Sequence, residues 1–183
     1  MSQVMTKTGI YDILGQLLIY PTEDISRIAT ECRESFQTSA PEAASAVEGF
    51  GEYVEKSTLA AMQEAYTRTF EINPVCALEV GWQLFGERYE RGTFIVKMRQ
   101  TLRSLDLPES TELPDHLSHV LQALDRLNPD EAAEFAGLFV APAVEKMIEG
   151  FKDNSNIYRD VLSGILCEVR SQYNLPAQGA QDD

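Results

Sequence analysis

Two histidines stand three residues apart in an acidic stretch, and they are the first candidates for chemistry. His116 and His119 are the only histidines of the chain, with Glu112 and Asp115 close by. Imidazole and carboxylate groups on one helical face are ligands that Zn²⁺ accepts. The spacing differs from H-E-x-x-H, and no third strong ligand stands at a diagnostic distance. We therefore expect no metal site, and expect the pair to cap a helix and to lie at the surface.

Motifs of other enzyme classes are incomplete. Gly81, Gly86 and Gly92 do not form G-x-G-x-x-G, and no predicted strand precedes them. The chain also lacks a P-loop and a nucleophile elbow. We expect no catalytic residue and no cofactor. A metal-dependent enzyme that uses His116 and His119 stays open as an alternative, and so does a plain helical adaptor.

The charge of the chain favours a basic partner. It has 15 Lys and Arg against 29 Asp and Glu, which leaves a net charge of −14. Phosphate recognition needs a basic surface, so this balance argues against a nucleic-acid binder. Glu109, Glu112 and Asp115 cluster in one short stretch. Carboxylates accept the planar fork of an arginine in pairs, and an apolar peptide needs a hydrophobic groove. A surface with clustered carboxylates beside a hydrophobic groove would suit a peptide that is basic at one end and apolar after it.

The elements that must position these residues are predicted to be helices. Apolar residues recur at intervals of three and four almost everywhere and nowhere alternate cleanly. Asn128-Pro129 is typical of a helix start, and Pro114 and Asp115 suit the first turn of another. Pro142 lies inside a helical pattern and should kink or divide that helix. We predict an all-α, single-domain helical bundle.

The organisation of the chain is expected to be simple. We predict one helical domain over residues 1–175 and a disordered acidic tail over 176–183, with irregular backbone from Glu71 to Gly92. Ser39 with Glu42 is a weaker helix start. Three scattered cysteines without a C-x-x-C pair fit a reducing compartment. The first residues do not read as a signal peptide, and no apolar window approaches the length of a membrane span, so a cytoplasmic location is expected.

Five segments, taken in order, resemble a known family. Tyr20-Pro21 closes the first helix as in L-x-x-Y-P, and residues 64–70 resemble E-x-Y-x-x-x-F. Residues 86–92 resemble G-x-x-x-x-R-G, residues 112–116 match E-x-P-D-H, and residues 156–158 resemble N-P-Y. In this order and spacing the chain resembles the TorD/DmsD/NarJ family of redox-enzyme maturation chaperones. The similarity is greatest to the NarJ branch, the nitrate reductase molybdenum-cofactor assembly chaperones.

The resemblance implies an all-helical cytoplasmic chaperone without catalytic activity. Members of the family bind the N-terminal segment of a molybdopterin-containing catalytic subunit, often a twin-arginine signal peptide or its remnant. They hold the apoprotein for molybdenum cofactor insertion and delay export or membrane docking. The implied partner is therefore a subunit with a basic-then-apolar N-terminus, and the implied oligomeric state is a monomer or a domain-swapped dimer.

The resemblance also implies which residues meet the client. Glu112, Pro114, Asp115 and His116 correspond to the acidic motif implicated in client recognition. Six further positions in or beside the other motifs are also candidate client contacts, with core packing or a structural turn as the alternative: Tyr66, Phe70, Trp82, Phe85, Arg88 and Arg91.

Two departures leave the client open. Gly81-Trp82-Gln83-Leu84 stands where the NarJ branch carries a Glu-His pair, and Asn156-Ile157-Tyr158 lacks the proline of its motif. The client is either nitrate reductase, which would place the chain in nitrate assimilation, or a related enzyme of the dimethyl sulfoxide reductase type.

Overall fold

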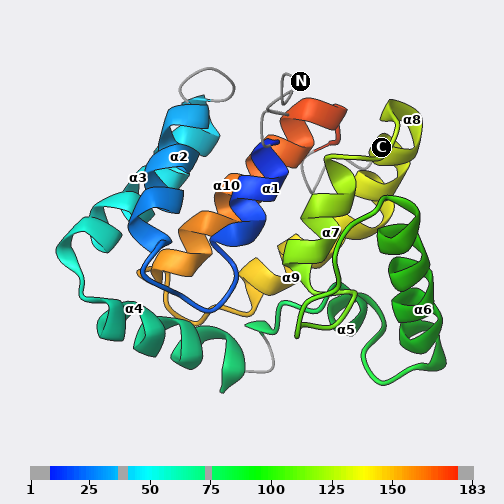
Figure 1. The fold of residues 1–183 in the computed structure, drawn as a ribbon, viewed down its shortest axis with the longest axis horizontal. Helices are drawn as coiled ribbons and strands as arrows, with labels where there is room; N and C mark the ends of the chain where they lie inside the picture. Colours follow the sequence, from blue (N-terminus) through cyan, green and yellow to red (C-terminus); the bar gives the residue numbers. More distant parts are fainter. Residues whose placement is uncertain (1–8, 37–40, 73–75, 177–183) are drawn as a thin grey trace, which may run out of the picture.

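The chain folds as a bundle of helices (Figure 1). The computed structural model describes residues 9–36, 41–72 and 76–176, and these ranges contain no β-strand. The helical elements are α1 (Ile10–Gln16), α2 (Ile25–Phe36), α3 (Pro41–Lys56), α4 (Leu59–Tyr66), η1 (Thr67–Glu71), α5 (Val80–Phe85), α6 (Tyr89–Ser104), α7 (Leu117–Leu124), α8 (Pro129–Phe135), η3 (Ala136–Val140), α9 (Ala141–Glu149) and α10 (Ile157–Tyr173). The predicted all-α bundle is confirmed.

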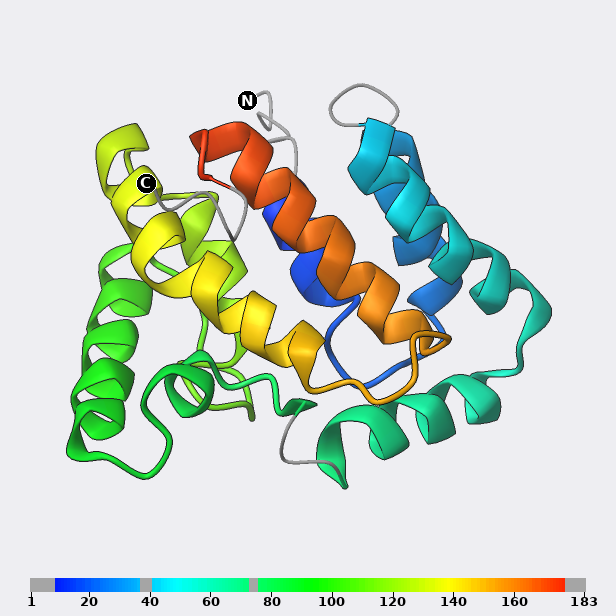
Figure 2. The same cartoon turned by 180° about the vertical axis from the view of Figure 1, so that it is seen from behind.

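Helices α1 and α10 form the centre of the bundle. On one side α10 packs against α3, which packs against α2, and on the other side α1 packs against α7 and α10 against α9 (Figures 1 and 2). The apolar stripes of these helices are fully buried, as at Leu14, Leu121 and Val161. Helix α4 crosses the lower end of the bundle in Figure 1, and α5 lies at the same end beside α6. The lower end therefore brings together segments that are far apart in the sequence.

The helix around Pro142 is divided, as the sequence predicts. Helix α8 passes into the π-helical segment η3, and α9 follows with Pro142 in its first turn. A proline lacks the N–H that continues the helical ladder, and its ring crowds the carbonyl four residues earlier. A wider π turn directly before it accommodates both effects. A second π-helical segment, η1, follows α4 and was not predicted.

Side-chain caps fix where several helices begin. The Asn128 side chain accepts from the Glu131 N–H at 3.0 Å with Pro129 as the first helical residue, which confirms the predicted start of α8. Helix α1 is capped from a distance, because the Asp125 carboxylate accepts from the Asp12 N–H at 2.7 Å. Gly9 leaves room for that carboxylate, since a Cβ at this position would lie 2.2 Å from Asp125 Oδ2.

Two predictions about local structure are corrected. Pro114 and Asp115 do not lie in the first turn of a helix, because α7 begins at Leu117 with His116 as its N-cap. Residues 71–92 are more regular than expected, since they contain α5 and the start of α6. The predicted cap at Ser39 and residues 177–183 of the predicted tail lie outside the described residues. Within the described chain, no helix has the length and apolar character that crossing a membrane requires.

Candidate functional site

The E-L-P-D-H segment forms a junction with the chain that enters α5. Glu79 and His116 make an isolated antiparallel bridge. The Val80 N–H donates to the Asp115 carbonyl at 2.8 Å, and the Leu117 N–H donates to the Leu78 carbonyl at 2.8 Å. These two bonds join the start of α5 to the start of α7. The motif therefore holds two segments together that lie more than thirty residues apart in the sequence.

The Asp115 side chain is buried within this junction. Its Oδ2 atom accepts from the Gly81 N–H at 3.1 Å, which satisfies a donor in the first turn of α5. Its Oδ1 atom is buried and has no hydrogen-bond partner among the described residues. Burial raises the pKa of the carboxyl group, and the nearby positive charge of Arg91 opposes that shift. Gly81 permits the close approach, because a Cβ there would lie 2.6 Å from Asp115 Oδ2.

The two histidines are buried and hold the same junction. His116 Nδ1 accepts from the Ser118 N–H at 3.3 Å, so the expected capping role is confirmed. Burial, and then the neighbouring His119, lower the pKa of His116 to about 4. His119 Nδ1 donates to the Leu113 carbonyl at 2.9 Å, and its Nε2 lies 3.0 Å from the Ser110 hydroxyl.

The expected surface position of the histidines is wrong. Both are less than 5% exposed, because their rings close the loop that precedes α7 against the bundle. Where the chain is described, no three His, Cys, Asp or Glu side chains come together as a metal site would require. The hydrogen bonds of the two rings satisfy polar atoms that burial removes from water.

Tyr66 and Phe70 belong to an aromatic cluster in the core. Tyr66 contacts Phe70, Tyr158 and Tyr20 edge-on, with ring centroids 5.1, 5.7 and 5.6 Å apart. Its hydroxyl donates to the Leu18 carbonyl at 3.1 Å. Only Tyr20, which is 44% exposed, carries this cluster to the surface. The aromatic residues of the E-x-Y-x-x-x-F segment therefore pack in the core. Tyr20 is the exposed member of their cluster.

Three carboxylates act on the aromatic cluster. Burial raises the pKa of Tyr66, and the negative charges of Glu112, Glu71 and Glu79 raise it further, so all three act electrostatically on its hydroxyl. None of the three forms an ion pair within the described chain, whereas Glu31, Glu55 and Glu64 do. Leu113, beside Glu112, is 43% exposed. We call Tyr20, Glu71, Glu79, Glu112 and Leu113 the acidic aromatic surface.

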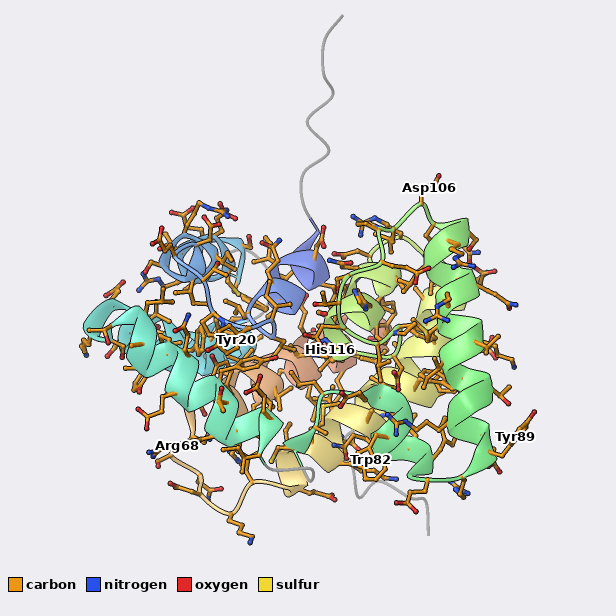
Figure 3. All side chains as sticks on the ribbon, turned by 60° about the horizontal axis from the view of Figure 1, so that its bottom comes forward. Tyr20, Arg68, Trp82, Tyr89, Asp106 and His116 are labelled. Carbon is orange, nitrogen blue, oxygen red and sulfur yellow. The ribbon has the colours of Figure 1, made fainter. Side chains whose placement is uncertain are left out.

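The acidic aromatic surface occupies the lower end of the bundle. In Figure 3, Tyr20 and His116 lie near the middle of this face, with Arg68 on the side of α4 and Trp82 on the side of α5. Arg68 lies beyond the surface and pairs with Glu64 at 2.5 Å. The surface is thus built from the segment that follows α1, the end of η1 and the junction between α5 and α7.

A pocket continues from the end of η1. It has a volume of about 320 Å³ and is bordered by the apolar side chains of Ile72, Cys76 and Phe151 and by five charged or polar residues: Arg68, Thr69, Lys152, Asp153 and Asn156. Ile72 is 70% exposed and directly follows Glu71. Apolar surface therefore begins next to one of the three carboxylates.

The remaining predicted residues lie around α5, and each has a structural contact. The Arg91 guanidinium stacks over the Trp82 ring at 5.2 Å, and Phe85 packs against Phe94 with ring centroids 5.8 Å apart. Arg88 donates to the carbonyls of residues 84 and 85, which ends α5. These side chains are not brought together with Glu112 in any described contact.

Sequence reasoning missed Glu71, Glu79 and the surface role of Tyr20. The Y-P motif drew attention to Tyr20 only as a helix end. Glu79 carried no signal, because its position beside the E-L-P-D-H segment arises from the bridge to His116, a contact between distant segments.

Comparison with known sequences agrees with this arrangement. The sequence model of the nitrate reductase delta subunit family matches residues 37–153, more than half of the chain. No individual curated protein matches the chain significantly. The matched region contains the signature helix, the junction of α5 and α7, and all three carboxylates of the acidic aromatic surface. The chain belongs to the nitrate reductase delta subunit family, which assists assembly of molybdenum-cofactor enzymes and is not itself catalytic.

Proposed function

We propose that the chain is a chaperone that binds the N-terminal segment of a molybdopterin oxidoreductase catalytic subunit. The segment is basic and then apolar, of the twin-arginine type or a remnant of it. Holding it keeps the apoprotein accessible for molybdenum cofactor insertion and assembly. The family supports a molybdenum-enzyme partner in general, and the acidic aromatic surface supports the finer assignment.

The observation that carries the proposal is the group of three carboxylates at the exposed edge of an aromatic cluster. Glu71, Glu79 and Glu112 lie close enough to raise the pKa of Tyr66 and have no cationic partner in the described chain. Negative charges that act on one aromatic cluster and have no internal partner attract a cation. An arginine fits best, because its fork binds carboxylates in pairs and its plane stacks on an aromatic ring such as Tyr20.

The neighbouring pocket gives the bound segment a direction. Arginines on Glu79 and Glu112 would be followed by apolar residues that pass Glu71 and enter the pocket at Ile72 and Phe151. Burial of two or three apolar side chains contributes several kcal/mol, and charge-assisted bonds about 1.5–3 kcal/mol each before ordering costs. A micromolar complex, about 8 kcal/mol, is within reach of that sum.

Asp115 and His116 have an indirect role in this proposal. Both side chains are buried, so they hold Glu112 and Glu79 in place through the junction of α5 and α7. Glu112 and Leu113 are the members of the E-L-P-D-H segment that face the client.

Calorimetry with a synthetic peptide tests the proposal. The peptide is the N-terminal segment of the catalytic subunit encoded beside this chain, and a second peptide replaces its arginines by glutamine. Glu112→Gln and Glu79→Gln should each weaken binding of the first peptide about tenfold, because each removes one charge-assisted contact. Glu34→Gln, on the exposed face of α2, is the matched control and should leave affinity unchanged.

Equal binding of both peptides, or equal loss in all three variants, would contradict a specific arginine site. Recovery of unrelated partners from a native lysate, with no molybdenum-enzyme subunit among them, would instead favour a general helical adaptor. The subunit that is recovered also distinguishes nitrate reductase from a related reductase as the client.

A further inference from the structure

Helix α6 has one face that the fold leaves uncovered. It stands at the edge of the molecule, with the other helices on one side only (Figures 1 and 2). Its inner face buries Phe94, Met98 and Leu102. Its outer face is a stripe of exposed residues at helical spacing: Tyr89, Gly92, Thr93, Val96, Gln100 and Arg103. We call this set the α6 stripe.

The α6 stripe is unusual in its charge and in its exposed apolar area. It contains no carboxylate, although the whole chain has a net charge of −14. Tyr89 is 88% exposed and Val96 54%. Tyr89 makes no ring contact or side-chain hydrogen bond within the described residues. The Tyr89 ring and the Val96 side chain lie on the same face of α6, about two turns apart, and removing their apolar area from water is favourable.

We propose that the α6 stripe is the contact between two copies of this chain, packed antiparallel about Val96. The stripe is self-complementary in that arrangement. Tyr89 and Arg103 are each seven residues from Val96, since 96 − 89 = 103 − 96 = 7, so each Tyr89 ring meets Arg103 of the other copy. Gly92 and Gln100 are each four residues from Val96 and also face one another. Val96 meets Val96 on the two-fold axis.

Two features of the structure favour the contacts of Arg103 and Gly92 with the second copy. Arg103 donates to Glu109 from Nε at 3.0 Å and from Nη2 at 2.8 Å, which fixes the guanidinium plane. The side chain is still 67% exposed, so the face of the plane is available to an aromatic ring. At Gly92 a Cβ would meet nothing within 4 Å, and the open space admits the glutamine of the opposite helix.

The charge distribution opposes a second copy less at the α6 stripe than at the faces that carry carboxylates. Two molecules of charge −14 repel one another, and they do so least where carboxylates are fewest. The stripe has one charged side chain, Arg103, and Glu109 of the same copy pairs with it. One helix from each copy is a small interface, so we expect a weak dimer, with a dissociation constant on the order of 100 µM.

Sedimentation equilibrium of the full chain between about 10 and 500 µM measures the association. Val96→Arg should raise the dissociation constant at least tenfold, because it places two cations on the axis, while the melting temperature measured at low concentration stays unchanged. Tyr89→Ala should weaken association less. Raising the salt concentration should strengthen the dimer by screening the net repulsion.

Disulfide trapping gives a second readout that does not depend on affinity. Val96→Cys should form a covalent dimer under mild oxidation, because the two thiols meet at the axis. Leu138→Cys is the matched control, an apolar position on η3 that is 57% exposed and lies off the stripe. A chain that stays monomeric at every concentration, or equal trapping at both positions, would overturn the proposal. So would a slowly dissociating dimer that Val96→Arg leaves intact, since that behaviour belongs to exchanged helices.

Discussion

At the scale of single residues, Gly81 and Gly92 differ in the space around them. A Cβ at Gly81 would meet Asp115 Oδ2 at 2.6 Å and Phe94 at 3.2 Å, whereas a Cβ at Gly92 would meet nothing. Gly81→Ala should therefore lower the free energy of unfolding by about 1–3 kcal/mol. Gly92→Ala should raise it by about 0.5–1 kcal/mol, because alanine is the better helix former. Urea unfolding of dilute protein measures both, and a similar effect of the two changes would contradict the close approach at Gly81.

His116 makes stability depend on pH. Its pKa in the folded chain is about 4 because the ring is buried, whereas the unfolded value is near 6.5. The unfolded chain therefore binds the proton more readily, and stability falls as the pH decreases from about 6.5 to about 4. The loss attributable to this residue reaches about 3 kcal/mol at the lower end.

His116→Asn isolates that contribution, because an asparagine can still accept from the Ser118 N–H. The buried Asp115 and Glu168 and the half-buried Asp125 have raised pKa values and act in the opposite direction, so the difference between the two chains is the relevant quantity. Parallel stability curves from pH 7 to pH 4 would contradict the burial of His116.

Residue types alone predicted part of this site. The acidic motif and the capping histidine were predictable from E-L-P-D-H. The burial of both histidines was not, because it arises from Leu113 and Ser110 folding back over the His119 ring. Periodicity describes one face of one helix and carries no information about a loop that covers it.

At the scale of elements, Asn156 and Asn128 differ in the hydrogen bonds that their side chains make. Both begin a helix by accepting from a backbone N–H, but Asn156 also donates to the Thr69 hydroxyl at 2.9 Å. Asn128→Ala should reduce stability by about 1 kcal/mol, the usual effect of a lost cap. Asn156→Ala should cost about 1–2 kcal/mol more, because η1 also loses its tie to α10.

A double-mutant cycle with Thr69→Ala separates the two roles of Asn156. A coupling energy near zero would show that the bond between Asn156 and Thr69 contributes nothing to stability. Thermal unfolding of the four chains provides the measurement.

Helix-capping residues and prolines predicted where helices begin or change better than they predicted which segments contact one another. Asn128-Pro129 and Pro142 each have one dominant local effect, and the structure shows both. The bridge between Glu79 and His116 joins a segment without apolar periodicity to the start of α7, and no local rule selects that partner. The π turn of η1 was also unpredictable, since its five residues continue the helical pattern of α4.

At the scale of the whole molecule, charge sets how the client binds. With a net charge of −14 and three unpaired carboxylates at one site, attraction of a basic peptide should be strongly screened by salt. We expect the dissociation constant of the arginine peptide to rise about tenfold between 20 mM and 500 mM salt. Titrations at four salt concentrations test this. An affinity independent of salt would assign binding to apolar contacts with Ile72 and Phe151 alone.

The remote cap of α1 has a consequence for the order in which the protein forms during synthesis. The first helix of the described chain takes its capping carboxylate from Asp125, 113 positions after Asp12. A ribosome must therefore add 113 further residues after Asp12 before α1 gains this contact. Until then α1 lacks its final anchor, and the closing of the bundle around it is a late event of translation.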